Sequence, residues 1–218
     1  MTTHSAQPDT TPQAAGPGPR SSAAAGLLTV VAGAVQGDGA LITAVYRNAS
    51  PVSEERLSFP WAGATAITTS LTWGITQLLI VVGLIAFTRG GAAPTAAGRV
   101  GGRLAVGGAV LYVIAHGLSL VAYDATVDDP IAVAVVAGIG IGTVLTAIGL
   151  IVAGTATLRC GVWVGWRRYA PLGLGVWMVA MTPLQFTPAL PVSVSVYALA
   201  LIALGLAMIV ESMGRPPR

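Results

Sequence analysis

The sequence contains no lysine, and all eleven of its basic residues are arginines. A chain without lysine cannot form a Schiff base with retinal or pyridoxal phosphate, because both need a lysine amine. It also lacks the lysine on which the phosphate-binding loop of many nucleotide-binding proteins depends. The single cysteine, Cys160, excludes a disulfide framework and a cysteine-based metal site within one chain. We therefore expect no cofactor and no metal.

Charge of either sign is scarce, since only 9% of the residues are charged and 54% are hydrophobic. A soluble domain carries about 25% charged residues, so most of this chain is not expected to meet water. A helix that spans a bilayer needs about 20 mostly apolar residues. Six segments meet this requirement: Ala23–Tyr46, Ala62–Phe87, Leu104–Tyr123, Ile131–Leu158, Ala170–Thr187 and Val192–Ser212. The sequence predicts an all-α, polytopic transmembrane bundle, because these segments are too long and too uniformly apolar for barrel strands.

The arginines are distributed unevenly between the two sides that six crossings would create. Nine of them fall on the side of the chain termini, and only Arg47 and Arg56 fall on the other side, together with five acidic residues. Cytoplasmic loops carry an excess of arginine and lysine, so both termini are expected in the cytoplasm of a bacterial inner membrane. The net charge of +3 then reflects topology, and we expect no nucleic-acid partner.

Three segments of different character follow from this topology. Residues 1–22 are polar and rich in proline and threonine, which predicts a disordered cytoplasmic tail. Residues 23–212 form the predicted six-helix transmembrane domain, and residues 213–218 form a short cytoplasmic tail. Aromatic and arginine side chains near the span ends are expected to anchor the bundle at the membrane interfaces; these are Trp61, Trp163, Trp166, Arg167 and Arg168.

A carboxylate interrupts the first span, in the stretch AVQGDGALI. Asp38 and His116 are expected at similar depths on parallel helices, with Tyr112 one turn from His116 and Gln36 two residues before Asp38. A charge at this depth is costly and usually faces the protein interior, so one interpretation is a buried Asp–His pair suited to proton relay. Two other interpretations, which together we favour, place Asp38 in a structural hydrogen bond or near the outer surface.

The second span carries threonines on one helical face, within about 100° of arc. They are Thr65, Thr68, Thr69, Thr72 and Thr76, and Gln77 lies beside them. One interpretation is a polar wall that lines a path through the bundle. The other, which we favour, is that each hydroxyl bonds a backbone carbonyl of its own helix.

Small residues at a spacing of four predict close helix contacts, because small side chains allow backbones to approach in lipid. The first span contains Gly33 and Gly37. The fourth span contains a longer ridge: Ala134, Gly138, Gly142 and Thr146.

The segment WVGWRRYAPL, from Trp163 to Leu172, resembles a cytoplasmic hairpin of small, uncharacterised multi-pass inner-membrane proteins of GC-rich bacteria. In these proteins an aromatic and arginine cluster leads into a Pro-Leu helix start. The resemblance implies a six-helix inner-membrane protein and brings no assigned activity and no catalytic residues.

No catalytic constellation is recognisable, since Ser193 and Ser195 have no identifiable base near them in the sequence. We expect an integral membrane protein without enzymatic activity, serving as a structural or accessory subunit. Its expected partners are the lipid bilayer and either other membrane proteins or a second copy. The alternative is a proton-coupled carrier of a small solute, with Asp38 as proton acceptor and His116 as its partner.

Overall fold

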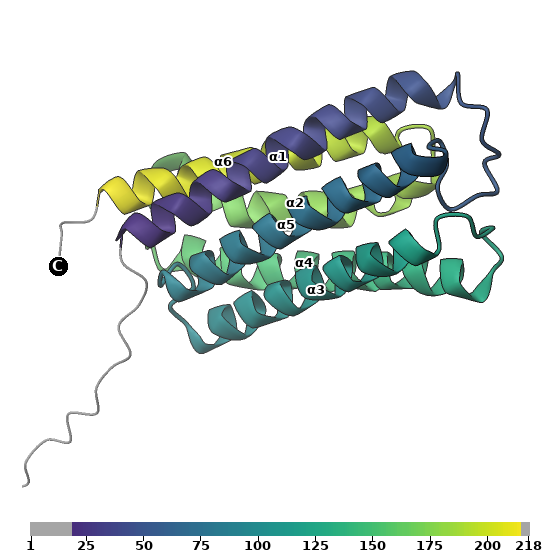
Figure 1. Ribbon diagram of the computed structural model, residues 1–218. Coiled ribbons are helices and arrows are strands. Elements are labelled where there is room, and N and C mark those ends of the chain that lie inside the picture. Colours follow the sequence, from purple (N-terminus) through teal and green to yellow (C-terminus); the bar gives the residue numbers. More distant parts are fainter. Residues whose placement is uncertain (1–18, 215–218) are drawn as a thin grey trace, which may run out of the picture.

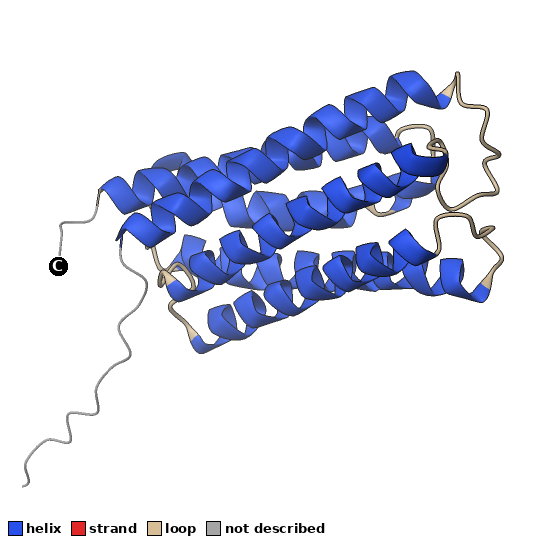
Figure 2. Cartoon of the chain, in the orientation of Figure 1, coloured by secondary structure: helices blue, strands red, loops and turns tan. Residues whose placement is uncertain are grey.

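The computed structural model describes residues 19–214, and in this part of the chain it is helical without any strand. Figure 1 shows the helices running nearly along one common direction. Six α-helices are present: α1 (Pro19–Arg47), α2 (Gly63–Arg89), α3 (Ala96–Val121), α4 (Pro130–Arg159), α5 (Ala170–Met181) and α6 (Leu190–Met213). Two short 3₁₀ segments flank α5: η1 (Gly165–Tyr169) and η2 (Pro183–Phe186). The predicted all-α fold is confirmed (Figure 2).

Five helices, α1, α2, α3, α4 and α6, are long and apolar enough to cross a membrane, which makes this a multi-pass membrane protein. The fifth predicted span differs from expectation, because α5 has only 12 residues. It ends at Met181, and Pro183 begins the 3₁₀ segment η2. Proline has no N–H to continue the α-helical hydrogen bonds, so the helix stops and tightens at this point.

The predicted boundary of the N-terminal tail also differs. α1 already begins at Pro19, so the last four residues of the expected tail belong to its first turn. Proline is well suited to the first helical turn, where its missing N–H has no intrahelical partner. The remainder of that tail and residues 215–218 lie outside the described residues.

The helices form a ring in which each packs on the next, and α6 returns to pack on α1. The two most extensive contacts are those of α3 with α4 and of α1 with α6 (Figure 1). α2 and α5 each close one side of the ring between these two pairs. A hydrogen bond joins α5 to α6, since Trp177 Nε1 of α5 donates to the Ser193 carbonyl of α6 at 3.0 Å.

Glycines allow both pairs to approach closely. A Cβ added to Gly205 of α6 would lie 2.6 Å from the carbonyl oxygen of Gly26 in α1. In the other pair, a Cβ added to Gly142 of α4 would lie 2.8 Å from the carbonyl oxygen of Gly108 in α3. Such spacing leaves no room for any side chain, and it supplies the dense backbone packing that joins helices in lipid.

The predicted small-residue ridges are therefore contacts over most of their length. Gly33 packs on α6, where an added Cβ would be 2.8 Å from the Ala198 carbonyl oxygen. Gly142 and Thr146 are buried against α3. Ala134 is exposed, so the ridge ends before it.

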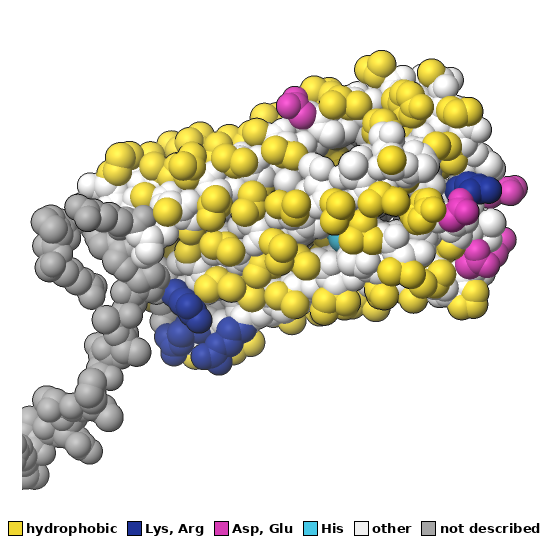
Figure 3. All heavy atoms as spheres, in the orientation of Figure 1, with side chains coloured by type: hydrophobic (Ala, Val, Ile, Leu, Met, Phe, Trp, Pro, Cys, Tyr) yellow, Lys and Arg dark blue, Asp and Glu magenta, His cyan; other side chains and the backbone are white. Residues whose placement is uncertain are grey.

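The two ends of the ring differ in charge, as Figure 3 shows. The arginine-rich end carries both ends of the described chain and the loops that follow α2 and α4, with Arg89, Arg99, Arg103, Arg159, Arg167 and Arg168. The acidic end carries the loops that follow α1 and α3, with Glu54, Glu55, Asp124, Asp128 and Asp129.

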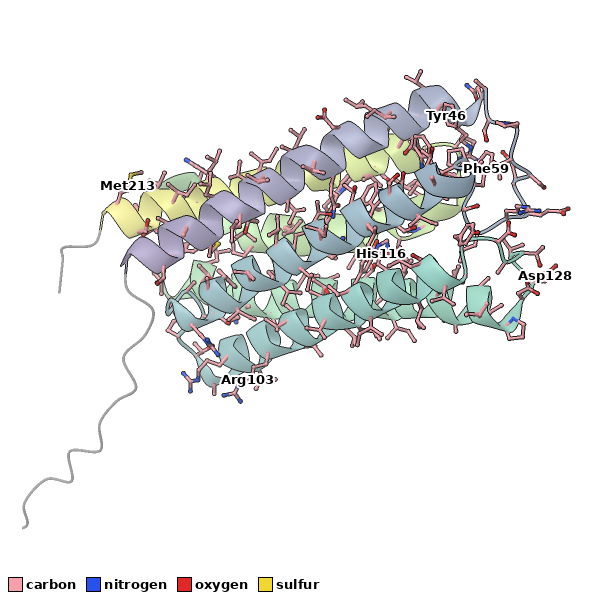
Figure 4. The ribbon with its side chains drawn as sticks, viewed as in Figure 1. Tyr46, Phe59, Arg103, His116, Asp128 and Met213 are labelled. Carbon is pink, nitrogen blue, oxygen red and sulfur yellow. The ribbon has the colours of Figure 1, made fainter. Side chains whose placement is uncertain are left out.

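The two loops of the acidic end are tied together. Arg56 forms an ion pair with Asp124, and the backbone N–H of Val127 donates to the Glu55 carbonyl at 2.8 Å. Tyr46 and Trp61 stack with ring centroids 4.9 Å apart. Figure 4 shows Tyr46 at this end of the bundle, where an amphipathic ring suits a membrane–water interface.

Candidate functional site

A small cavity, the central chamber, lies inside the helix ring and takes lining residues from all six α-helices. Its volume is about 40 Å³. One water molecule needs about 10–15 Å³ on this measure, so the chamber has room for about three waters. Its lining consists of Gln36, Trp73, Gln77, Ile80, Ala109, Tyr112, Thr143, Thr146, Met178, Met181, Val194 and Tyr197.

Two glutamine amides bring polarity to the chamber. Gln36 and Gln77 are only 2% and 4% exposed, so their amides need partners inside the protein. Gln36 Nε2 donates to Thr76 Oγ1 at 3.3 Å, which joins α1 to α2. The Gln77 side chain lies against the Tyr197 hydroxyl in the chamber lining, a polar contact between α2 and α6. The amides therefore connect three neighbouring helices of the ring.

The chamber threonines are satisfied by backbone carbonyls. Thr143 Oγ1 donates to the Ile139 carbonyl at 2.8 Å, one turn back in α4. Thr146 Oγ1 donates to the Gly142 carbonyl at 2.7 Å and also lies 3.4 Å from the Ala105 carbonyl of α3. Hydroxyls bonded in this way behave as small packing groups and leave little capacity to bind a solute.

The threonine face of the second span does not line the chamber. Thr65 and Thr72 are exposed, Thr69 is half-buried, and Thr76 is buried. Thr72 Oγ1 donates to the Thr68 carbonyl at 2.8 Å, and Thr76 Oγ1 donates to the Trp73 carbonyl at 2.9 Å. The interpretation of this face as the wall of a path is thus wrong, and these two hydroxyls bond their own helix as the favoured interpretation requires.

His116 lies beside the chamber but does not line it. Its ring is 5.0 Å from that of Tyr112, centroid to centroid, at an angle of 46°. A Cβ added to Gly74 would lie 3.8 Å from the His116 Cβ, so the imidazole sits at the seam between α2 and α3 (Figure 4). Its Nε2 atom is buried and makes no hydrogen bond within the described chain.

Asp38 does not pair with His116. The carboxylate is exposed on α1, and no described residue forms a hydrogen bond or ion pair with it. The reason is helical geometry: residues two apart point about 200° apart around a helix, so Gln36 and Asp38 cannot both face the ring interior. Gln36 occupies the interior position, so the interpretation of Asp38 and His116 as a proton relay is wrong, and so is a structural hydrogen bond of Asp38 inside the bundle.

Asp38 instead lies in a stripe of exposed apolar side chains along α1. The stripe consists of Leu27, Val31, Val35, Leu41, Ile42 and Val45. Figure 3 shows an isolated carboxylate among the apolar side chains of one flank of the bundle. Asp38 precedes Tyr46 by eight residues, which places it about 12 Å below the interface that the tyrosine marks. A charged aspartate near the bilayer centre costs about 2.5–3.5 kcal/mol on insertion scales.

The predicted interface anchors divide into two groups. Trp166 is 55% exposed at the arginine-rich end and half-buried Trp61 stacks on Tyr46, as anchors would. Trp163 is only 3% exposed and contacts Phe87 edge-on at 5.5 Å, so it belongs to the core and its prediction as an anchor is wrong.

The two anchor arginines have specific partners. Arg167 Nε lies 3.3 Å from Glu211 Oε1, which joins η1 to the end of α6. The Arg168 guanidinium lies over the Tyr169 ring, 4.8 Å from its centroid. The first contact ties the loop between α4 and α5 to α6, and the second is local to the loop.

The sequence reasoning missed several chamber residues, above all Tyr197, Trp73, Met178 and Met181. Tyr197 carries the one aromatic ring of α6, and that contrast with the small and aliphatic residues around it was a usable signal. The methionines gave none, because methionine is common in apolar spans. Gln36, Gln77 and Tyr112, predicted as polar-core residues, do line the chamber.

Within residues 19–214 no group of three or more His, Cys, Asp or Glu side chains is arranged to hold a metal ion. Comparison with known proteins found no matching family model, no matching curated protein and no matching solved structure.

Proposed function

We propose that the protein is a six-span subunit of the bacterial cytoplasmic membrane, with both termini in the cytoplasm, that serves a structural or accessory role. The observation that carries this proposal is the central chamber. The Gln36 amide and the two chamber threonines bond to side chains or to the backbone, and the volume of about 40 Å³ has room for about three waters. A small polar centre bonded in this way is suited to holding helices together.

Charge at the two ends supports the proposed orientation. Six arginines lie in the two connections at the arginine-rich end or in the helix turns that flank them, whereas the two loops at the acidic end carry five acidic residues. The positive-inside rule assigns the arginine-rich end to the cytoplasm. Trp166 at that end and Tyr46 at the other mark the two interfaces.

The sixth crossing is supported by the path from Ala170 to Phe186. The chain leaves the arginine-rich end in α5 and reaches the acidic end after η2, where α6 begins. The 12 residues of α5 and the 4 of η2 rise about 26 Å together, close to the thickness of the hydrocarbon core. α5 is buried against α4 and α6, so the short helix is covered by protein on two sides.

The carrier alternative finds no support in the contacts. It needs a proton acceptor inside the chamber, and Asp38 is on the outside of α1. No titratable carboxylate lines the chamber, and its polar lining consists of amides, hydroxyls and the Trp73 indole.

The test is to replace Gln77 by leucine. The change leaves the Tyr197 hydroxyl without its partner, and an unsatisfied buried polar group costs about 1–3 kcal/mol. We expect Gln77→Leu to lower the free energy of unfolding in mixed micelles by this amount. The matched control is Thr72→Val on the exposed face of the same helix, for which we expect a change below about 0.5 kcal/mol.

The same variants distinguish a structural protein from a carrier. The purified protein is reconstituted in vesicles that contain a pH-sensitive dye. We expect protons to enter these vesicles no faster than they enter vesicles without protein, for the unaltered chain and for Gln77→Leu alike. Proton flux above that background that disappears in Gln77→Leu, together with unchanged stability, would refute the structural role.

A further inference from the structure

The exposed stripe of α1 is apolar except at its Asp38 carboxylate. The apolar side chains that surround it, Val31, Val35, Leu41, Ile42 and Val45, are between 37% and 81% exposed. They recur three and four residues apart, so they form one continuous face. Because α1 packs on α2 and α6 with its other faces, this stripe points away from the ring.

The described chain offers no cation to this carboxylate. The nearest arginine on α1, Arg47, is nine residues away and pairs with Glu54 at 3.4 Å. His116 is held at the seam of α2 and α3, beside Tyr112. An aspartate side chain is too short to extend about 12 Å to the interface, unlike lysine or arginine, whose long stems reach water from inside the membrane.

A second copy of the chain does not supply the missing charge. Two copies that met symmetrically along this stripe would place one Asp38 beside the other, and like charges in a medium of low dielectric repel. The spans contain no lysine, and their arginines lie within two turns of a helix end, far along the membrane normal from Asp38. Charge complementarity therefore points to a different protein.

We propose that α1 binds a transmembrane helix of another protein that presents a lysine or arginine opposite Asp38. This proposal rests on the accessory role proposed above and names the chemistry of the partner. The apolar stripe packs along the partner helix, and the carboxylate pairs with its cation. Ala34, which is exposed one turn before Asp38, lets the two backbones approach at that level.

The probe for this test is a synthetic transmembrane helix of leucine and alanine that carries one lysine about 12 Å below its outer end. The full chain is reconstituted in vesicles of phosphatidylcholine and phosphatidylglycerol, and association is measured by fluorescence energy transfer. A second probe carries leucine in place of the lysine. We expect the lysine probe to bind about tenfold more tightly than the leucine probe, which corresponds to about 1.4 kcal/mol.

Variants of the chain show whether Asp38 is responsible. Asp38→Asn is expected to abolish the preference for the lysine probe, and Asp38→Glu is expected to retain it. The matched control, Asp128→Asn, removes the same charge from the acidic end and is expected to leave the preference unchanged. Gel filtration of each variant confirms that the bundle is folded.

Two results would overturn the proposal. One is that the preference for the lysine probe is absent in the unaltered chain or survives in Asp38→Asn. The other is Asp38-dependent energy transfer between differently labelled copies of the chain alone, which would make a second copy the occupant. Neither result would affect the Gln77 measurements, so a failure of this proposal is separable from a failure of the structural role.

Discussion

The contact between α1 and α6 makes a sharp prediction for Gly205→Ala. The added Cβ would lie 2.6 Å from the Gly26 carbonyl oxygen and 2.7 Å from a methyl group of Val30. A carbon and a carbonyl oxygen approach no closer than about 3.3 Å in normal contacts, so the helices must separate by about 0.7 Å. That gap forfeits between a quarter and a half of the dispersion energy of each affected atom pair.

We expect this overpacking to lower the free energy of unfolding by about 1–3 kcal/mol. The matched control is Gly140→Ala in α4, where an added Cβ has no neighbour within 4 Å. At an open helical position the same change removes backbone freedom from the unfolded chain and favours the helix by about 0.5–1 kcal/mol. The two variants should therefore differ in sign.

The assay is equilibrium unfolding in mixed micelles, followed by far-ultraviolet circular dichroism. The double variant Gly26→Ala/Gly205→Ala provides a further check, because both methyl groups press on the same crossing point. Their costs should be less than additive, since the first substitution already separates the helices. If Gly205→Ala is as stable as Gly140→Ala, the close backbone approach is not what holds α1 on α6.

Two further predictions concern topology and core packing. The single thiol, Cys160, is exposed at the arginine-rich end, so a membrane-impermeant maleimide should label it in inverted vesicles and not in intact cells. The double variant Cys160→Ser/Ser53→Cys, which moves the thiol to the acidic end, should show the reverse. Labelling of Cys160 in intact cells would contradict the proposed topology. Leu150→Ala should lower the free energy of unfolding by about 2 kcal/mol, because it leaves a cavity at a fully buried position, whereas Val144→Ala, on the exposed face of the same helix, should change it by less than about 0.5 kcal/mol. Equal effects of the two substitutions on unfolding in micelles would contradict the assignment of the core.

The unequal success of the site predictions has one physical cause. The position of a polar residue within a hydrophobic span predicts its depth along the membrane normal. It predicts the direction of the side chain poorly, because nearly every face of such a helix is apolar. Gln36 and Asp38 both interrupt the same span, and the sequence gives no preference between them. The packing of α1 on α2 and α6 orients Gln36 inward, and the helical repeat then turns Asp38 outward.

The sequence alone determined the class of the protein. Long apolar segments with so few charges have no stable conformation except helices in a membrane, because unpaired backbone groups are too costly in lipid. It also located some of the glycines that join helices, among them Gly33 and Gly142, and the glutamines of the polar centre. The class of the protein and the positions of these residues along the spans depend on composition and local spacing, and both can be read from the sequence.

The tertiary structure decided what the helices do with those residues. The closed ring, the chamber at its centre and the outward carboxylate all depend on which helices are neighbours, and sequence spacing carries no information on that. Pro183 shows the same limit, since hydropathy alone predicts one continuous span where the chain makes a short helix and a 3₁₀ turn. Lipid does not distinguish one apolar face from another, so only contacts between helices select the face that becomes the interior.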